Sequence, residues 1–195
     1  MFVLGITGLI GSGKSEVCKL LGNYGFQVIE LDEMAHQSYK VGTDVYEEII
    51  NIFGSQIINP DLTINRKKLG DIVFFNKKKL TELEELVWPK VDNEIRNRIR
   101  TLKKSLCEKI VIESALLFKS GWDKFCDQIW FVESSESIIK SRLVNLRGMS
   151  EDKIDSILSL QLNSPHIKEK ADKIILNDDD LKNLEEIINK TLKIV

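Results

Sequence analysis

The segment 8–15 constrains the fold of this chain more than any other. It reads Gly-Leu-Ile-Gly-Ser-Gly-Lys-Ser, fits the pattern GxxxxGK[ST], and lies between the apolar stretch Phe2–Ile6 and a helical stretch of about Lys14–Asn23. Glycines let backbone N–H groups turn toward phosphate oxygens, and the helix start adds the positive end of its dipole. We therefore predict a strand, a phosphate-binding loop and a helix, with the loop formed by Gly8, Leu9, Ile10, Gly11, Ser12, Gly13, Lys14 and Ser15.

Two side chains of this loop have expected roles in chemistry. We expect Lys14 to reach the β and γ phosphates of a nucleotide and to act in catalysis. We expect the hydroxyl of Ser15 to bind Mg²⁺, which bridges the same two phosphates. The pattern thus predicts a nucleotide-binding protein, but it does not indicate which reaction the protein catalyses.

Short apolar runs alternate with longer amphipathic stretches along the chain, and this alternation is typical of an α/β fold with a parallel sheet. Gly25 follows the first helix and can adopt the left-handed conformation of a helix end. We predict a five-stranded parallel sheet covered on both faces, with strands at Phe2–Ile6, Gln27–Leu31, Lys109–Glu113, Gln128–Val132 and Lys173–Leu176.

The whole chain, 1–195, is expected to be one domain that contains an insertion. Residues 33–108 between the second and third strands are too many for a simple crossover and have a helical pattern. One helix is expected to begin at Asp44, and a later one is expected to break or kink at Pro89. We interpret 33–108 as an inserted helical subdomain.

Two further helices follow the fourth strand, at Ile138–Leu146 and Lys153–Leu162, joined at Gly148. We interpret region 138–165 as a small lid. Arg142 and Arg147 on this lid are candidates to meet the charge of a transferring phosphate, although a solvated helix face explains them as well. A helix at Leu181–Leu192 closes the chain.

A carboxylate at the carboxyl edge of the sheet could orient or deprotonate an attacking hydroxyl, or hold a water on the metal. Asp32 follows the second strand and is the leading candidate; Glu113 ends the third strand and is its rival. Helix capping or solvent exposure remains an alternative for either. His36 and His166 stand alone in the sequence, which does not favour a metal site.

Composition excludes several other classes. The chain has 28 basic and 30 acidic residues, a net charge of −2, so its overall charge does not favour nucleic acid. No stretch approaches the ~18 apolar residues of a membrane span, and no basic leader precedes Phe2. Three scattered cysteines fit a reducing compartment. We expect a cytoplasmic protein without a membrane or nucleic-acid partner, as a monomer or weak homo-oligomer.

The order of motifs resembles the dephospho-CoA kinase family over nearly the whole chain. The segment 7–15 is close to the family's TGGIGSGKS, 28–36 to its VIDADxIAR/H, 66–69 with 73–74 to its RxxL…IF, and 116–118 to the core of its PLLFE. Arg142, Gln161 and Asn177 also match. The resemblance implies a P-loop NTPase-type three-layer sandwich and transfer of phosphate from ATP, with Mg²⁺, to the 3′-hydroxyl of dephospho-CoA, the last step of coenzyme A synthesis.

The resemblance also implies roles for individual residues. Asp32 takes the place of the catalytic Asp, the helical insertion grips the pantetheine and diphosphate end of the acceptor, and the lid lies over ATP. The implied site comprises a catalytic set of Asp32, Lys14 and Arg142, further ATP contacts at Arg147 and Asn177, a metal contact of Asp32 through water, and acceptor contacts at Asp32, His36, Arg66, Leu116 and Leu117.

Some positions depart from the family pattern. Trp88 stands where His usually precedes the proline, Ala115 replaces Pro, Lys119 replaces Glu, and Leu146 takes the second lid arginine position, with Arg147 one residue later. Three alternatives remain: another small-metabolite or nucleoside monophosphate kinase, a GTP-dependent switch, and a nucleotide-binding relative without catalysis, the last of which these substitutions suggest. The switch would need an Asn-Lys-x-Asp motif, but Lys79 follows Asn76-Lys77-Lys78.

Overall fold

The computed structural model describes residues 1–74, 76–162 and 167–193. The chain forms two compact units, one from residues 1–30 with 106–195 and one from residues 31–105. His166 and the end of the expected lid at 163–165 lie outside the described residues. No helix in the described part of the chain combines the length and apolarity that crossing a membrane requires.

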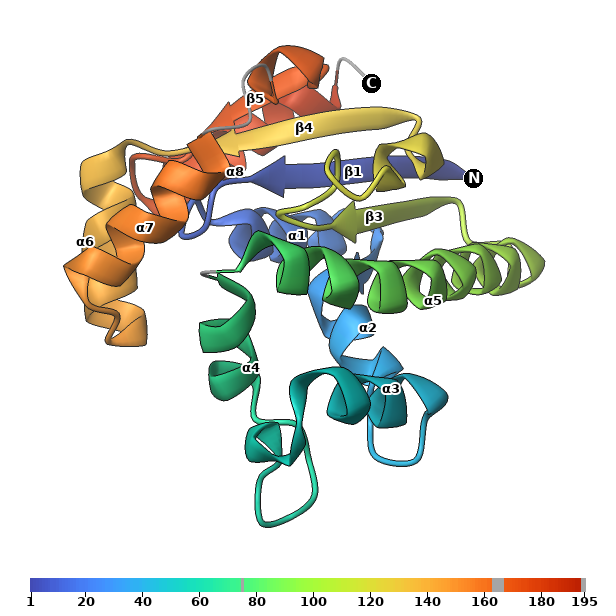
Figure 1. Ribbon diagram of the computed structural model, residues 1–195. Helices are drawn as coiled ribbons and strands as arrows, with labels where there is room; N and C mark the ends of the chain where they lie inside the picture. Colours follow the sequence, from blue (N-terminus) through green and yellow to red (C-terminus); the bar gives the residue numbers. More distant parts are fainter. Residues whose placement is uncertain (75, 163–166, 194–195) are drawn as a thin grey trace. The chain divides into compact units, whose positions relative to one another are not determined.

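The first unit contains the five-stranded parallel sheet that the sequence predicts (Figure 1). The strand order is β2-β3-β1-β4-β5, so the loop after β1 leaves from the centre of the sheet. The strands are β1 (Phe2–Gly8), β2 (Gln27–Glu30), β3 (Lys109–Glu113), β4 (Gln128–Glu133) and β5 (Lys173–Leu176). The helical segments of this unit are α1 (Lys14–Asn23), η2 (Trp122–Phe125), α6 (Glu136–Arg147), α7 (Glu151–Leu162), η3 (Lys168–Lys170) and α8 (Leu181–Leu192).

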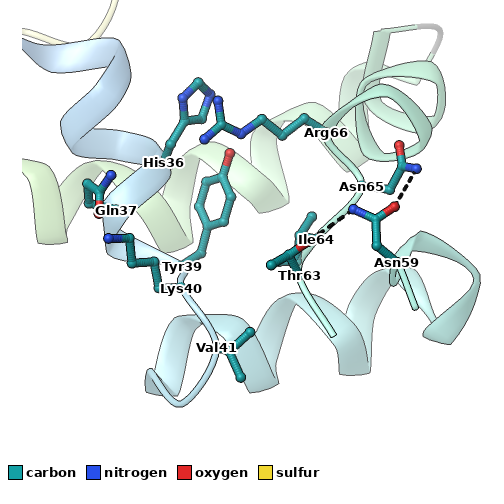
Figure 2. Close-up of a pocket in the computed structure, with 10 residues that line it drawn as sticks. All are labelled: His36, Gln37, Tyr39, Lys40, Val41, Asn59, Thr63, Ile64, Asn65 and Arg66. Atoms are coloured by element: carbon teal, nitrogen blue, oxygen red, sulfur yellow. Dashed lines mark hydrogen bonds between the residues drawn. The ribbon is translucent and has the colours of Figure 1, made fainter. Parts of the chain in front are cut away.

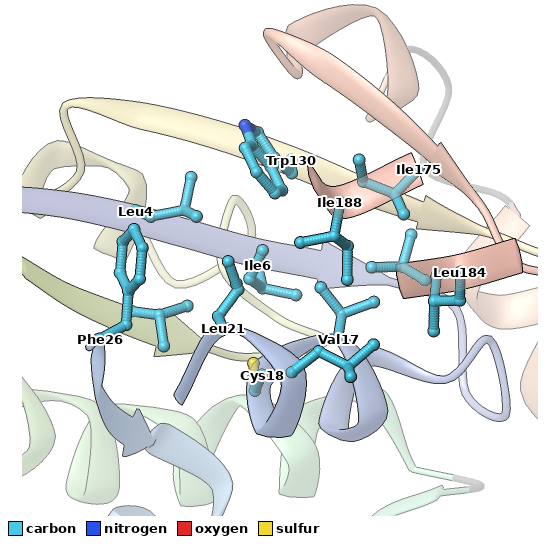
Figure 3. Packing of buried hydrophobic residues seen from close by; sticks show 13 residues of the cluster. Leu4, Ile6, Val17, Cys18, Leu21, Phe26, Trp130, Ile175, Leu184 and Ile188 are labelled. Carbon is cyan, nitrogen blue, oxygen red and sulfur yellow. The ribbon is translucent and has the colours of Figure 1, made fainter. Parts of the chain in front are cut away.

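Helices α1 and α8 cover one face of the sheet through a continuous apolar cluster (Figure 3). Side chains of alternate strand positions, such as Leu4, Ile6 and Trp130, point into this cluster and are fully buried. On the opposite face, a Cβ on Gly5 would lie 2.8 Å from Cys126 Sγ and 2.9 Å from Leu117 Cδ2. The segment that follows β3 therefore packs directly on the backbone of the central strand.

Helices α6 and α7 form an antiparallel pair beyond the carboxyl ends of the strands (Figure 1). Gly148 ends α6 with φ 60°, a left-handed conformation that suits glycine. The pair has its own small core of Ile139, Leu143, Ile154 and Leu158. Both helices begin two residues before the expected positions and agree with the prediction in type.

The second unit is mainly helical, with α2 (Leu31–Ser38), α3 (Asp44–Phe53), η1 (Ser55–Ile57), α4 (Arg66–Phe74) and α5 (Lys77–Lys104). An isolated antiparallel bridge joins Ile58 to Ile64 in the connection before α4. Thr43 caps α3, since its hydroxyl accepts the Tyr46 N–H at 3.2 Å. Of the expected break or kink at Pro89, the break does not occur, because α5 runs through this residue. Proline removes one helical hydrogen bond, but the face with Val87, Val91 and Ile95 is buried on both sides of it and holds the helix together.

Candidate active site

The phosphate loop connects β1 to α1 in a conformation that requires glycine at two positions. Gly13 has φ 95°, and a Cβ there would lie 2.0 Å from Asn177 Nδ2. A Cβ on Gly8 would lie 2.3 Å from the carbonyl oxygen of Val132. The loop is therefore packed against the ends of β4 and β5, with no room for side chains at these glycines.

The ammonium group of Lys14 folds back over this loop. Its Nζ donates hydrogen bonds to the carbonyl oxygens of Gly8 at 3.2 Å and Leu9 at 3.1 Å. The residue is only 8% exposed, and a buried ammonium needs such partners to offset the loss of water. The positive charge predicted for phosphate binding thus lies at the mouth of the glycine loop.

Three polar side chains hold the loop through the backbone of Ser12. We call these residues, Ser134, Arg142 and Asn177, the Ser12 clamp. The carbonyl oxygen of Ser12 accepts hydrogen bonds from Asn177 Nδ2 at 2.8 Å, Ser134 Oγ at 3.1 Å and Arg142 Nη1 at 3.4 Å. Arg142 Nη2 also donates to the Asn177 carbonyl at 2.9 Å. Arg142 and Asn177 thus lie beside the loop, where both donate to the Ser12 carbonyl, and their expected contacts with ATP stay predictions.

Sequence reasoning missed Ser134 in this clamp. The single proton of its hydroxyl is shared between the carbonyl oxygens of Asn177 at 2.7 Å and Ser12 at 3.1 Å, and the hydroxyl oxygen accepts from Arg142 Nη1 at 3.1 Å. The residue directly follows β4, and a small polar residue at the carboxyl end of an apolar strand was the available signal. Beside it, the Ser12 hydroxyl is buried and has no hydrogen-bond partner among the described residues.

The rival carboxylate, Glu113, lies next to the expected metal ligand. Ser15 Oγ donates to Glu113 Oε1 at 3.2 Å. Hydroxyl and carboxylate oxygens are the ligands that Mg²⁺ prefers, so this pair fits the metal. No group of three or more His, Cys, Asp or Glu suited to a metal occurs among residues 1–74, 76–162 and 167–193. Burial, and then the charge of Glu113, raises the pKa of the Cys18 thiol, which keeps it protonated beside this carboxylate.

Three other predicted site residues of the first unit differ in how exposed their side chains are. Arg147 is exposed at the end of α6. Leu116 is 36% exposed after β3, whereas Leu117 is fully buried against Gly5. The Leu117 side chain therefore packs on the central strand, and its expected contact with the acceptor stays a prediction.

The second unit contains a cavity of about 710 Å³ that brings together residues from two separate segments (Figure 2). His36, Tyr39 and the side chain of Arg66 point toward one another across it. The lining residues are His36, Gln37, Tyr39, Lys40, Val41, Asn59, Thr63, Ile64, Asn65 and Arg66. The lining holds basic side chains and no acidic one, so it favours an anion.

The surroundings in the cavity shift the pKa values of two of its residues. Burial, and then the nearby charge of Arg66, lowers the pKa of His36 below its ordinary 6.5. Burial also raises the pKa of Tyr39 to about 12, so its hydroxyl stays neutral. Hydrogen bonds from Asn59 Nδ2 to Thr63 Oγ1 at 3.0 Å and from Asn65 Nδ2 to Asn59 Oδ1 at 2.8 Å stiffen the opposite wall (Figure 2).

Asp32 is the second residue of α2, and its side chain is exposed. It follows Glu30, the last residue of β2, which pairs with Glu113 of β3. Two residues span at most about 7 Å, so chain connectivity keeps the Asp32 backbone near this edge of the sheet.

Comparison with known proteins gives consistent results. The family model described as dephospho-CoA kinase matches residues 2–183. A dephospho-CoA kinase of Fusobacterium nucleatum is 37% identical over 94% of this chain and 93% of its own length. Many other curated proteins of the same name also match, including one from Dehalococcoides mccartyi at 30% identity over 97% of both chains.

Solved structures support the same fold. A crystal structure of a Thermus thermophilus protein has a TM-score of 0.82 at 25% identity and covers the whole of this chain and 97% of its own. A dephospho-CoA kinase from Campylobacter jejuni has a TM-score of 0.63 at 23% identity, which supports the fold alone. The family model, the length over which relatives align and the intact phosphate loop lead to one conclusion: this chain belongs to the dephospho-CoA kinase family.

Proposed function

We propose that this protein transfers the γ-phosphoryl group of ATP to the 3′-hydroxyl of dephospho-CoA and so completes coenzyme A. The observation that carries the proposal is the Lys14 ammonium, buried over a glycine loop whose shape fits a phosphate chain, in a member of this kinase family. In-line transfer needs little covalent chemistry from the protein, so positioning and charge supply most of the rate.

The donor site would be built from the loop and the start of α1. Lys14 would exchange its two carbonyl partners for oxygens of the β and γ phosphates. Ser15 and Glu113 would hold Mg²⁺, Ser15 directly and Glu113 either directly or through a water. When bound, the metal supplies positive charge that offsets the charge on the phosphates.

For the acceptor, we propose Asp32 as the group that orients the 3′-hydroxyl and takes its proton. The ribose oxygen forms a bond to the γ phosphorus, the bond from that phosphorus to the bridging oxygen of ADP breaks, and the hydroxyl proton passes to the Asp32 carboxylate. The support is the place of Asp32 in the chain, two residues after the strand that pairs with β3. A water-mediated contact of Asp32 with Mg²⁺ belongs to the same proposal.

The cavity of the helical unit would hold the anionic part of dephospho-CoA. Arg66 and His36 face one another across it, and Lys40 adds a third basic group (Figure 2). An arginine can bind phosphate oxygens through two parallel hydrogen bonds, which makes Arg66 the anchor of the diphosphate. Residues 33–108 would then act as the substrate-binding insertion.

The α6–α7 region, within 138–165, would act as the lid over ATP. We assign Arg142 the task of keeping the loop in shape through Ser12, together with Asn177. Exposed Arg147 would meet the charge of the transferring group. The cysteines at 18, 107 and 126 are free thiols, in keeping with a cytoplasmic protein, and we propose a monomer or weak homo-oligomer.

One assay tests the proposal. The purified protein is given ATP and Mg²⁺ with either dephospho-CoA or a panel of nucleoside monophosphates, and ADP release is followed together with the mass of the product. We expect turnover with dephospho-CoA and a product heavier by one phosphoryl group. Turnover confined to the panel would assign the protein to another kinase reaction, and no turnover with bound ATP would indicate a relative without catalysis.

A further inference from the structure

The side chain of Gln161, on α7, reaches the phosphate loop. Its Oε1 accepts the backbone N–H of Ile10 at 2.9 Å, although the two residues are 151 positions apart in the chain. Ile10 lies in the half of the loop that precedes Gly11, away from the start of α1. The contact therefore links the lid helix to the backbone of the loop itself.

The same half of the loop also packs against the lid helices. Leu9 and Ile10 are half-buried against the α6–α7 core, together with Met149. A Cβ on Gly11 would lie 3.0 Å from Leu143 Cγ, which shows how closely α6 approaches the loop. The hydrogen bond of Gln161 is thus the polar part of a larger contact between the loop and the α6–α7 helices. Because a hydrogen bond requires a defined distance and angle, it fixes how α7 is oriented on the loop.

The backbone N–H groups of the loop have two different tasks. Ser12 N–H donates to the Leu9 carbonyl at 3.2 Å, and Ile10 N–H donates to Gln161, so these two groups shape the loop. The hydrogen bonds within α1 begin only at Glu16 and Val17, both of which donate to the Gly13 carbonyl. The N–H groups at a helix start are the ones that bind anions, so shaping and phosphate binding use separate groups.

We propose that Gln161 is a positioning residue for ATP binding. Its side chain accepts the hydrogen bond of the Ile10 N–H. This bond keeps the loop in the conformation that receives the phosphates, and it keeps α7 packed against the loop. A half-buried N–H without an acceptor would favour rearrangement of the loop, which ATP binding would then have to reverse. The inference rests on the proposed use of ATP but not on the identity of the acceptor.

The opposite role would be obstruction, in which a phosphate oxygen replaces Gln161 on the Ile10 N–H. The two roles predict opposite signs, because loss of an obstructing side chain tightens ATP binding whereas loss of a positioning side chain weakens it. The apolar docking of Leu9 and Ile10 favours positioning, since it holds the same segment in the same place.

Three variants test the proposal. Gln161→Met keeps the length of the side chain and removes the acceptor, while Gln161→Glu keeps an acceptor oxygen. Gln128→Met is the matched control, because Gln128 Oε1 accepts the Trp130 Nε1–H at the same 2.9 Å in the same unit. We would measure KM for ATP and for dephospho-CoA, the dissociation constant of Mg-ATP by calorimetry, and hydrogen exchange of the Ile10 N–H.

We expect Gln161→Met to raise the KM and dissociation constant of ATP by roughly 5- to 10-fold, the effect of one lost hydrogen bond, with KM for dephospho-CoA unchanged. The Ile10 N–H should exchange faster in Gln161→Met and remain protected in Gln161→Glu. The control should lower stability without changing KM. Unchanged or tighter ATP binding in Gln161→Met would overturn the proposal. Calorimetry and exchange keep this test separate from that of the proposed reaction, which fails only if the wild-type protein does not phosphorylate dephospho-CoA.

Discussion

The phosphate loop and the cavity of the helical unit differ in how their functional groups are held. Around the loop, Lys14 and Asn177 are buried, and each donates to backbone carbonyls. In the cavity, Arg66 and Lys40 are exposed. Hydrogen bonds tie the wall at Asn59, Thr63 and Asn65, and on α2 Gln37 Nε2 donates to Glu33 Oε1.

This difference indicates how each site would obtain its specificity. A buried, hydrogen-bonded loop is preorganised and accepts one shape of ligand, the phosphate chain of a nucleotide. Exposed basic side chains are adjustable and bind a larger anion mainly through charge. Substitutions near the loop should therefore affect both stability and donor binding, whereas substitutions in the cavity should affect the acceptor alone.

The largest effect is expected for Asp32→Asn, which removes the proposed proton acceptor but keeps the size of the side chain. We expect kcat to fall by about 10²- to 10⁴-fold, with the dissociation constant of Mg-ATP unchanged. Asp44→Asn is the matched control, because Asp44 is an exposed carboxylate at the start of α3 in the same unit. Wild-type turnover in Asp32→Asn would remove this residue from the mechanism and leave Glu113 as the candidate base.

The next effect concerns the cavity. Arg66→Ala should raise KM for dephospho-CoA by roughly 10- to 100-fold, the range for a hydrogen bond to a charged group, while KM for ATP stays the same. Arg66→Lys should recover only part of this loss, because an ammonium cannot make two parallel hydrogen bonds. The control is Arg96→Ala, which removes an exposed partner of Asp92 on α5. An equal rise in both KM values would contradict a separate acceptor cavity.

A smaller effect, on stability and donor binding together, is expected in the Ser12 clamp. Asn177→Ala removes a buried hydrogen bond to Ser12 and should lower the free energy of unfolding by about 1–3 kcal/mol, as measured by denaturant titration. KM for ATP should rise as the loop loosens. Asn183→Ala serves as control, because its hydrogen bond to Asp179 is exposed. Normal stability with weak ATP binding would instead indicate direct contact of Asn177 with ATP.

The smallest effect is a pH dependence that arises from His36. Its pKa in the folded protein lies below the unfolded value of 6.5, so near that pH the unfolded chain binds more protons. The contribution of His36 to stability is therefore complete above pH 6.5 and is lost as the pH falls through the folded pKa. Glu33, whose Oε2 lies 3.6 Å from His36 Nδ1, opposes this shift, and Arg66 reinforces it.

Denaturation of wild type and His36→Gln at pH 7.5 and pH 5.5 measures this contribution. The wild type should lose more stability between the two values than the variant. A bound anion favours protonated His36, so the affinity of wild type for dephospho-CoA should also increase toward low pH. Identical pH profiles for the two proteins would show that His36 does not titrate within the cavity.

Much of the fold could be predicted from the sequence because the signals are local. Each predicted strand ends within two residues of its expected position. The signals used, short apolar runs and glycines at their boundaries, lie within the strand itself or directly beside it. The absence of a break at Pro89 has a tertiary cause. Local propensity favours a break there, but burial of one face of α5 is worth more than the lost hydrogen bond.

The candidate site was predictable to a smaller extent. The phosphate loop is contiguous, so its sequence alone determined its place between β1 and α1 and the nature of its ligand. The role of Ser134, the contact of Gln161 with Ile10 and the burial of Leu117 were decided only by tertiary structure, because each depends on residues distant in the chain that meet in space. The cavity of the helical unit is a further case, since residues 36–41 and 59–66 form it only after the helices have packed.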